Sequence, residues 1–188
     1  MTIVPRWEWR TFGDDFGAGE ERFSALTPER IQESDETYVL STRSDASVKV
    51  RDGLMDVKHL EAVDDDGLEQ WMPVLKAEFP LAAPDVATLY STLGVPGAPG
   101  ALSLSGLLAA VDAAPELRAV DVHKRRARYT VGGCMAELSE LSADGRPTRT
   151  IAIELEDAAR VIAAVRDLGL ADRPNTSMAR GLKALLGL

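Results

Sequence analysis

The chain has 188 residues, 45% of them hydrophobic, and a formal net charge of −9. This length and composition allow one sizeable core, so we expect a single domain over residues 1–188. The acidic balance argues against a nucleic-acid or anionic-membrane surface, because long polyanions bind broad basic fields. We therefore expect neither a nucleic-acid nor a membrane partner, and a homodimer is left open.

Cysteine content and the N-terminal residues favour the cytoplasm. The single Cys134 cannot form an internal disulfide, which fits a reducing compartment. No run of eighteen apolar residues occurs, and Arg6, Glu8 and Arg10 stand where a signal peptide would need an apolar stretch. We therefore expect a cytoplasmic protein.

Alternation of apolar and charged residues predicts strands in the first half of the chain. Asp52-Gly53 is a hairpin signal between the third and fourth of these strands, and Asp64 to Gly67 is a turn before the fifth. The predicted strands run roughly over residues 3–12, 35–42, 46–52, 54–63 and 68–79.

The second half mixes helices with further strands. Pro84-Asp85 opens a helix over 84–93, and the loop at 94–100 leads to another at about 103–113. The fold class is therefore α+β, with about eight antiparallel strands closed or nearly closed into a barrel and helices packed outside. The remaining predicted elements are strands at 117–131, 134–142 and 147–156 and helices at 157–168 and about 177–186.

Several predicted strands carry charges on one face. In Val122 to Tyr129, for example, Lys124, Arg126 and Arg128 alternate with other residues. Every second side chain of a strand points the same way, so a closed sheet would collect these charges in its interior. Cations beside carboxylates in an enclosed space favour a site for a polyanion with a metal. The other such sets are Arg6, Glu8 and Arg10; Lys49 and Arg51; and Glu154 and Glu156.

Simpler interpretations exist for these residues. The charged faces could be solvated or could protect a sheet edge, Glu8 could only pair with Arg10, and Arg180 could cap a helix or pair at the surface. His59 and His123 have no zinc spacing with Cys134. We expect Trp7, Trp9 and Trp71 to anchor outer helices.

The ordered set of motifs resembles the CYTH domains of the triphosphate tunnel metalloenzyme superfamily over nearly the whole chain. That family carries two glutamates and a lysine on its first strand, where this chain has Arg6-Trp7-Glu8-Trp9-Arg10. Arg6 thus stands at the first glutamate position, and Ser177 and Met178 at a terminal Lys-Tyr pair. The other similar stretches are Asp35-Glu36-Thr37-Tyr38, Val48-Lys49-Val50-Arg51, Asp56-Val57-Lys58, Lys124 to Tyr129, Ile153-Glu154-Leu155-Glu156 and Thr176 to Leu182.

The resemblance implies an eight-stranded antiparallel tunnel in which Lys and Arg hold a triphosphate and glutamates bind Mg²⁺ or Mn²⁺. The metal ligands would be Glu8, Glu137, Glu154 and Glu156. Catalysis would rest on Glu8, Arg10, Lys49, Arg51, Lys58, Lys124 and Arg126. The expected phosphate-binding residues are Arg10, Lys49, Arg51, Lys58, Lys124, Arg126, Arg128 and Arg180.

The resemblance implies a divalent-metal-dependent triphosphatase, a hydrolase of phosphoric anhydrides. Arg can hold phosphate oxygens bidentately, Lys acts as a point charge, and a metal on carboxylates orients an attacking water. The substrate would be inorganic tripolyphosphate, thiamine triphosphate or a nucleoside triphosphate. The alternatives are a non-catalytic polyphosphate- or nucleotide-binding module, favoured by Arg6, Ser177 and Met178, and a class IV type adenylate cyclase.

Overall fold

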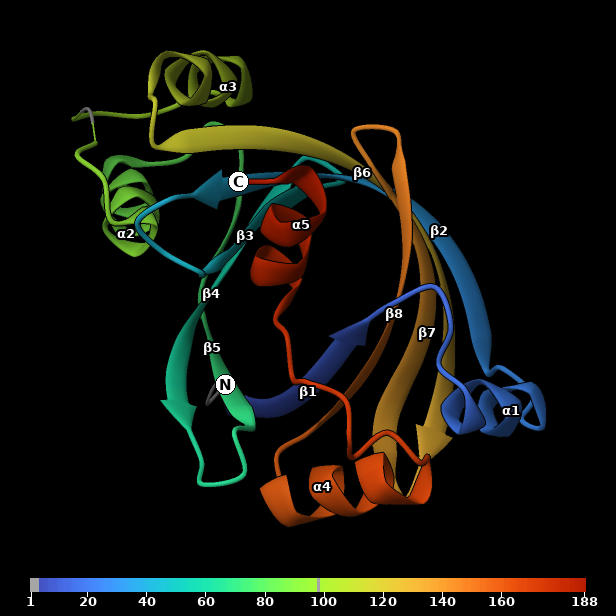
Figure 1. The fold of residues 1–188 in the computed structure, drawn as a ribbon. Helices are drawn as coiled ribbons and strands as arrows, with labels where there is room; N and C mark the ends of the chain where they lie inside the picture. The colour runs from blue at the N-terminus through green and yellow to red at the C-terminus, as the bar shows by residue number, and fades with distance from the viewer. Residues whose placement is uncertain (1–3, 98) are drawn as a thin grey trace.

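The computed structural model describes residues 4–97 and 99–188, which form eight strands and five helices (Figure 1). In chain order these are β1 (Arg6–Phe12), α1 (Ala18–Ser24), β2 (Arg30–Ser41), β3 (Ser47–Arg51), β4 (Leu54–Val63), β5 (Glu69–Glu78), α2 (Ala83–Leu93), α3 (Leu104–Ala113), β6 (Leu117–Val131), β7 (Cys134–Ala143), β8 (Arg146–Leu155), α4 (Ala158–Asp167) and α5 (Met178–Leu186).

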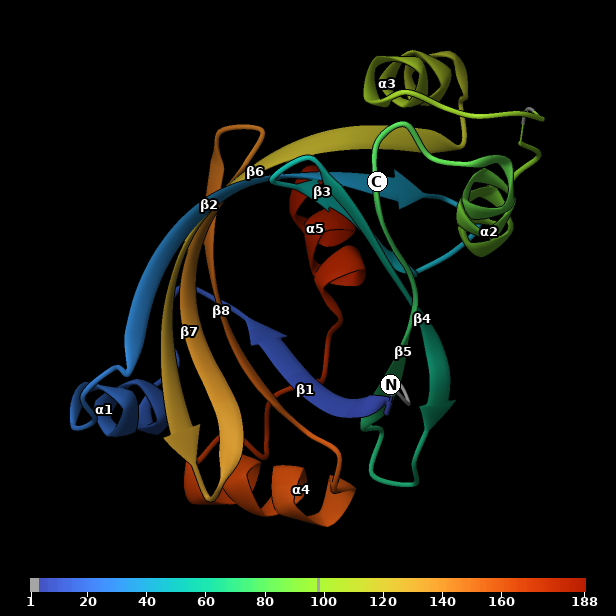
Figure 2. The same ribbon diagram turned by 180° about the vertical axis from the view of Figure 1, so that it is seen from behind.

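The strands form a closed antiparallel barrel. Their order around it is β1-β5-β4-β3-β2-β6-β7-β8, and β8 pairs with β1 to close the ring. The longest ladder joins β2 to β6, from Arg30 opposite Arg128 to Ser41 opposite Leu117, whereas β1 and β5 share only three residue pairs. The predicted fold class is confirmed, and Figures 1 and 2 show the barrel from opposite sides.

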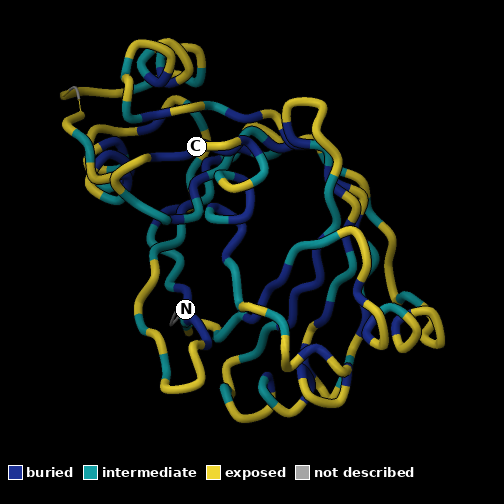
Figure 3. The backbone as a smooth tube through the Cα atoms, in the orientation of Figure 1, coloured by how far each residue is buried: buried dark blue, intermediate teal, exposed yellow. Residues whose placement is uncertain are grey.

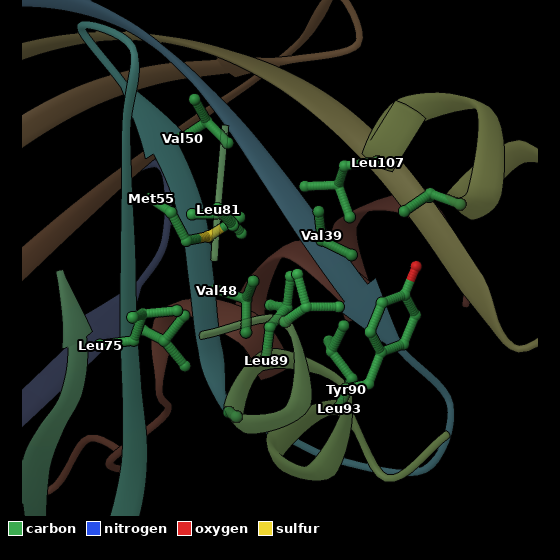
Figure 4. Close-up of a cluster of buried hydrophobic side chains, with 14 of the residues drawn as sticks. Val39, Val48, Val50, Met55, Leu75, Leu81, Leu89, Tyr90, Leu93 and Leu107 are labelled. Carbon is green, nitrogen blue, oxygen red and sulfur yellow. The ribbon is translucent and has the colours of Figure 1, made fainter. Parts of the chain in front are cut away.

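Two apolar layers cover the outside of the barrel. On one side, α2 and α3 pack on outward-facing residues such as Val48, Val50 and Met55 (Figure 4). On the other side, α1 and α4 pack on Trp9 and Ile153, among others. In Figure 3 the barrel strands alternate between buried and less buried positions, as the period-two pattern requires.

Helix α5 occupies a different place, because it closes one end of the barrel. Its residues Met178 and Leu182 pack with Tyr38 of β2 and Val122 of β6, which lie on the inward faces of their strands. Lys183 Nζ donates to Asp45 Oδ1 at 2.7 Å and so ties the helix to the loop between β2 and β3. Figures 1 and 2 show α5 within the opening that the strands surround.

One helix and several boundaries differ from the predicted ones. Helix α1 was not predicted, because it has seven residues and no side-chain cap at Gly17. Strand β2 begins at Arg30, where Arg30 to Ser34 are mostly polar on both faces and carry no apolar alternation. Strand β8 ends at Leu155, just before Asp157 caps α4 by accepting from the Arg160 N–H. Within residues 4–97 and 99–188, no helix combines the length and apolarity needed to cross a membrane.

Candidate functional site

A cavity of about 260 Å³ lies inside the barrel next to α5. Its lining combines strand residues with Ser177 and Met178 at the start of α5. The inward orientation predicted from strand periodicity is confirmed for most of the charged set, since one cavity collects them. The charged residues that were predicted from the sequence and that line the cavity are Glu8, Arg10, Lys49, Lys58, Lys124, Arg126, Arg128, Glu137 and Glu154.

At the end near α5, three cations surround one carboxylate. Glu137 Oε1 lies 3.0 Å from Lys124 Nζ and 3.3 Å from Arg10 Nη1, and its Oε2 lies 3.5 Å from Arg126 Nη1. Burial alone would raise the pKa of Glu137, but Lys124, Arg10 and Arg126 hold it far below its usual range. We call these four residues the closed-end cluster; its cations outnumber its carboxylate.

Part of this positive charge has no protein partner. Arg126 is 7% exposed, and its Nε and Nη2 atoms contact no acceptor in the described residues. Ser139 Oγ, also buried, is equally without a partner there. Leaving a buried polar donor without a partner costs roughly 1–3 kcal/mol, and the cost is higher when the group is charged. The cluster is therefore built to receive an acceptor, and an anion supplies both acceptor atoms and charge.

The pKa values of Lys124 and Arg10, two cations of the cluster, shift in opposite directions. Burial lowers the pKa of Lys124 to about 8, although Glu137 partly offsets this. Burial would also lower the pKa of Arg10, but Glu8 and Glu137 raise it above its ordinary value. Arg10 therefore remains charged, whereas the charge of Lys124 depends on pH within the neutral to alkaline range.

A second buried carboxylate, Glu36, separates two cations that we predicted to act together. Its Oε2 lies 3.3 Å from Lys49 Nζ and its Oε1 lies 3.4 Å from Arg51 Nη1, while Tyr38 Oη donates to it at 3.0 Å. Burial opposes ionisation, but Lys49 and Lys124 bring the pKa of Glu36 down to about 2.

Arg51 shares the inward face of β3 with Lys49 but, contrary to our prediction, it does not line the same cavity. Lys49 lines the cavity, but Arg51 lies on the far side of Glu36, 30% exposed, and lines a separate surface pocket. Arg51 is the last residue of β3, next to the hairpin residue Asp52, and its Nε lies 3.8 Å from Asp52 Oδ2.

Beyond Arg10, the inner face of the barrel is acidic. Glu8 of β1 pairs in register with Glu69 of β5 and Glu154 of β8, which places three carboxylates side by side on the inner face. We call this row the mouth carboxylates. Phe12, the last residue of β1, packs against the apolar residues around α5. Arg10 and then Glu8 follow toward the start of the strand.

Each mouth carboxylate contacts an arginine. Glu8 Oε1 lies 2.9 Å from Arg10 Nε. Glu154 Oε1 lies 3.5 Å from Arg6 Nη1, and Glu69 Oε1 lies 2.5 Å from Arg180 Nη2. Burial raises the pKa of Glu154, and the nearby Glu8 raises it further. Burial also raises that of Glu69, although Arg180 opposes this.

The mouth carboxylates fit a hard divalent cation by chemistry. Glu8 and Glu154 present oxygen donors to the cavity from adjacent strands, and their mutual repulsion is not fully offset by Arg6 and Lys58. In the described parts of the chain, however, no three ligating side chains converge as a ready metal cluster. A metal would bind after Arg6 leaves Glu154.

Three further predicted site residues differ from expectation. Glu156 lies beyond the end of β8, is exposed, and does not line the cavity, so its inward orientation is wrong; the chain leaves the sheet there to start α4. Glu137 lines the cavity but is engaged by three cations, which makes it their counter-charge. Arg180 does not line the cavity and instead contacts Glu69.

Sequence reasoning also missed some functional positions. Trp71 was predicted to face outward but lines the cavity, because β5 pairs Trp71 with the inward-facing Arg6 and the register of β4 and β5 shifts farther along. Glu69, two residues earlier, shares this face and could have been found from the same alternation. Asn175 gives no signal: its side chain holds the β1 backbone from a loop.

Comparison with known proteins supports the fold. No family model and no curated protein matches the chain. Among solved structures, a candidate adenylate cyclase from Bacillus halodurans matches with a TM-score of 0.52 at 11% identity, covering 95% of this chain and 97% of that one. PH1012 from Pyrococcus horikoshii OT3 matches with 0.52 at 18% identity, covering 93% and 97%.

A third structure carries a functional description. HpAC1 from Hippeastrum, a candidate adenylyl cyclase described as having a dominant triphosphatase activity, matches with a TM-score of 0.54 at 13% identity, covering 97% of this chain and 95% of that one. At these identities the likeness concerns the fold. The fold that the CYTH resemblance implied is therefore shown.

Proposed function

We propose that the chain is a CYTH-type protein that binds a small triphosphate in the barrel cavity and hydrolyses one of its phosphoanhydride bonds with Mg²⁺ or Mn²⁺. One observation carries the proposal. Arg126 is buried with two unpartnered nitrogen atoms in the described structure, beside Arg10 and Lys124; the three cations share Glu137, and Arg10 also contacts Glu8. A multiply charged anion satisfies these donors better than water does.

The distribution of charge along the cavity supports a polyphosphate over a single phosphate. Cations continue outward from the closed-end cluster through Lys49, Lys58 and Arg128, which line the same cavity. A chain of phosphates can contact several of these cations at once, whereas one phosphate cannot. The triphosphatase description of HpAC1, which shares the fold, agrees with this substrate class.

The residues of the chain then have distinct tasks in the reaction. Arg10 and Arg126 can hold phosphate oxygens with their guanidinium forks, and Lys124 neutralises charge that develops as the anhydride bond breaks. Glu8 and Glu154 would hold the metal, which when bound polarises the phosphoryl group and orients an attacking water. Helix α5 closes the barrel end and limits bulk water around the phosphates. This arrangement requires no covalent nucleophile.

A binding module without turnover is the second candidate, and the contact between Arg6 and Glu154 favours it. This ion pair places a fixed cation on a carboxylate that catalysis would give to a metal. Arg6 is 48% exposed, so the pair is solvent-screened and can open. If the ion pair between Arg6 and Glu154 opens easily, a metal can bind and the protein is a slow enzyme; if it stays closed, the protein only binds its ligand.

The test is phosphate release from tripolyphosphate, ATP and thiamine triphosphate, each with Mg²⁺, Mn²⁺ or EDTA. We expect metal-dependent release of orthophosphate from at least one substrate, and loss of release in Arg126→Gln. The variant Arg125→Gln, altered on the outer face of the same strand, serves as the control. Tight tripolyphosphate binding without turnover in any metal would select the binding module, and formation of cyclic AMP together with pyrophosphate from ATP would indicate cyclisation.

A further inference from the structure

The N-terminal end of α5 faces the cavity and is held there firmly. Ser177 and Met178 line the cavity and are only 3% and 7% exposed. The residues just before α5 bind the backbone of Arg10, which β5 does not pair with. The Arg10 N–H donates to Asn175 Oδ1 at 2.8 Å, and the Thr176 N–H donates to the Arg10 carbonyl at 2.6 Å. The start of α5 is thus fixed to the strand that carries Arg10.

The first turn of α5 presents free backbone donors. Ser177 caps the helix by accepting from the Arg180 N–H at 3.4 Å, and its carbonyl accepts from the Gly181 N–H. The N–H groups of Met178 and Ala179 have no intrahelical acceptor, as at every helix start, and within the described residues nothing else accepts from them. The two residues are 7% and 1% exposed, and Met178 lines the cavity.

An independent observation points to a ligand at the same place. Arg126, on β6 rather than α5, lines the same cavity with Nε and Nη2 unpartnered in the described structure. Helix N-termini and unpaired guanidinium groups favour the same kind of ligand, a compact anion with several acceptor oxygens. Glu69, one of the mouth carboxylates, lies against Arg180 in the same turn of α5, and this ion pair neutralises it, so Arg126 and the backbone donors are what attract an anion there.

We propose that the first turn of α5 is a phosphate subsite, in which the backbone N–H groups of Met178 and Ala179, together with Arg126, bind the terminal phosphate of the polyphosphate. The inference rests on the proposed function and adds a direction of binding. The innermost phosphate contacts α5, and the rest of the ligand extends along Lys49 and Lys58 toward the mouth.

The subsite is tested by removing one backbone donor while keeping the helix. Met178 is the first helical residue, where proline is well tolerated, and Ser177 has φ −61° and ψ 160°, a conformation that the residue before proline favours. Met178→Pro therefore deletes the N–H together with the methionine side chain, and Met178→Ala controls for the lost side chain. Leu104→Pro, at the first position of α3 after Ser103, which is also extended, controls for proline itself.

Tripolyphosphate affinity is measured by isothermal titration calorimetry in EDTA at low salt. We expect binding to Met178→Pro to be about tenfold or more weaker than to Met178→Ala, the factor that one hydrogen bond to a charged group is worth. Leu104→Pro should bind like the wild type. Equal affinities of Met178→Pro and Met178→Ala would overturn the subsite.

A second pair of variants keeps the test valid should Met178→Pro unfold. Asp and Asn both cap helices well, but Ser177→Asp adds a carboxylate that competes with phosphate for the free donors. We expect Ser177→Asp to weaken tripolyphosphate binding more than tenfold and Ser177→Asn less than threefold; similar affinities would refute the subsite. If Arg126→Gln weakens binding while the α5 variants do not, the proposed function stands without the subsite. A wild type that does not bind refutes both.

Discussion

The closed-end cluster and the mouth carboxylates have opposite electrostatic character. At the closed end, Arg10, Lys124 and Arg126 share Glu137, so positive charge is in excess. At the mouth, carboxylates stand in a row, and arginines neutralise them. On the proposed function, phosphate binds the closed-end cluster and a metal binds Glu8 and Glu154. One cavity can then hold both parts of a metal–polyphosphate complex.

The two ends also differ in solvent exposure. The side chains of Lys124 and Arg126 are 4% and 8% exposed, whereas that of Arg6 at the mouth is 48% exposed. Water and salt screen an exposed ion pair strongly and a buried one weakly. Substitutions at the closed end should therefore have large effects, and those at the Arg6 pair should have small ones.

The largest effect is expected from Glu137→Gln. It removes the carboxylate shared by three buried cations, and breaking such a buried pair costs roughly 3–5 kcal/mol. We expect the melting temperature to fall by about 10 °C for a chain of this size. Saturating tripolyphosphate should recover part of this loss, because the anion replaces the missing charge. Glu140→Gln, altered on the exposed face of β7, should melt within about 2 °C of the wild type; a similar fall would contradict the special role of Glu137.

The double variant Glu8→Gln with Glu154→Gln tests the mouth. It preserves size but removes the charge that a divalent cation needs, so turnover should fall by at least about a hundredfold. Tripolyphosphate binding in EDTA should persist, because it depends on the closed end. Glu156→Gln is the matched control, since Glu156 lies outside the cavity and its loss should leave turnover within about twofold. Equal losses in both variants would refute the assignment.

A pH dependence follows from Lys124, whose pKa burial lowers to about 8. A phosphate ligand favours the charged form, so affinity should fall about tenfold between pH 7 and 9. Folding responds in the opposite sense: the unfolded chain binds more protons between pH 8 and the ordinary lysine pKa, so this group's contribution to stability rises with pH there. Lys124→Arg should flatten the affinity profile, and an unchanged slope in that variant would assign the titration to another group, such as Lys49.

The smallest effect is expected from Arg6→Gln. Opening an exposed ion pair is worth at most about 1 kcal/mol, so Mn²⁺ should bind about two- to fivefold more tightly once Glu154 is released. Calorimetric titration of Mn²⁺ into the ligand-free protein measures this directly. Arg125→Gln, which removes an exposed arginine elsewhere, should not change it. Weaker metal binding in Arg6→Gln would show that Arg6 assists the metal instead of competing with it.

Local alternation in the sequence was sufficient to predict much of this molecule. The inward faces of β6 and β3 follow directly from the two-residue period that sets Lys124 and Arg126 apart from their neighbours, and Val48 and Val50 opposite Lys49. Capping and turn residues located most of the other elements. The barrel itself follows because strands with one apolar and one charged face need both a core and an enclosed interior.

The wrong predictions for individual residues have a common cause. A local pattern does not show where a strand stops, where its register shifts or which strand it pairs with. Glu156 continues the alternation of Glu154, but the chain turns into α4. Trp71 faces inward although it is apolar, and a register shift separates it from the outward Leu75. The contacts of Glu137 depend on the pairing of β6 with β7, a long-range property that short motifs do not encode.

The central claim is that the closed-end cluster is a polyphosphate site. Titrating tripolyphosphate into the wild type and into Arg126→Gln, in EDTA and low salt, tests it most directly. We predict saturable binding of one tripolyphosphate per chain to the wild type and at least about tenfold weaker binding to Arg126→Gln, since the variant loses the unpartnered buried guanidinium. Absence of saturable binding to the wild type, or equal affinities of the two proteins, would contradict the account.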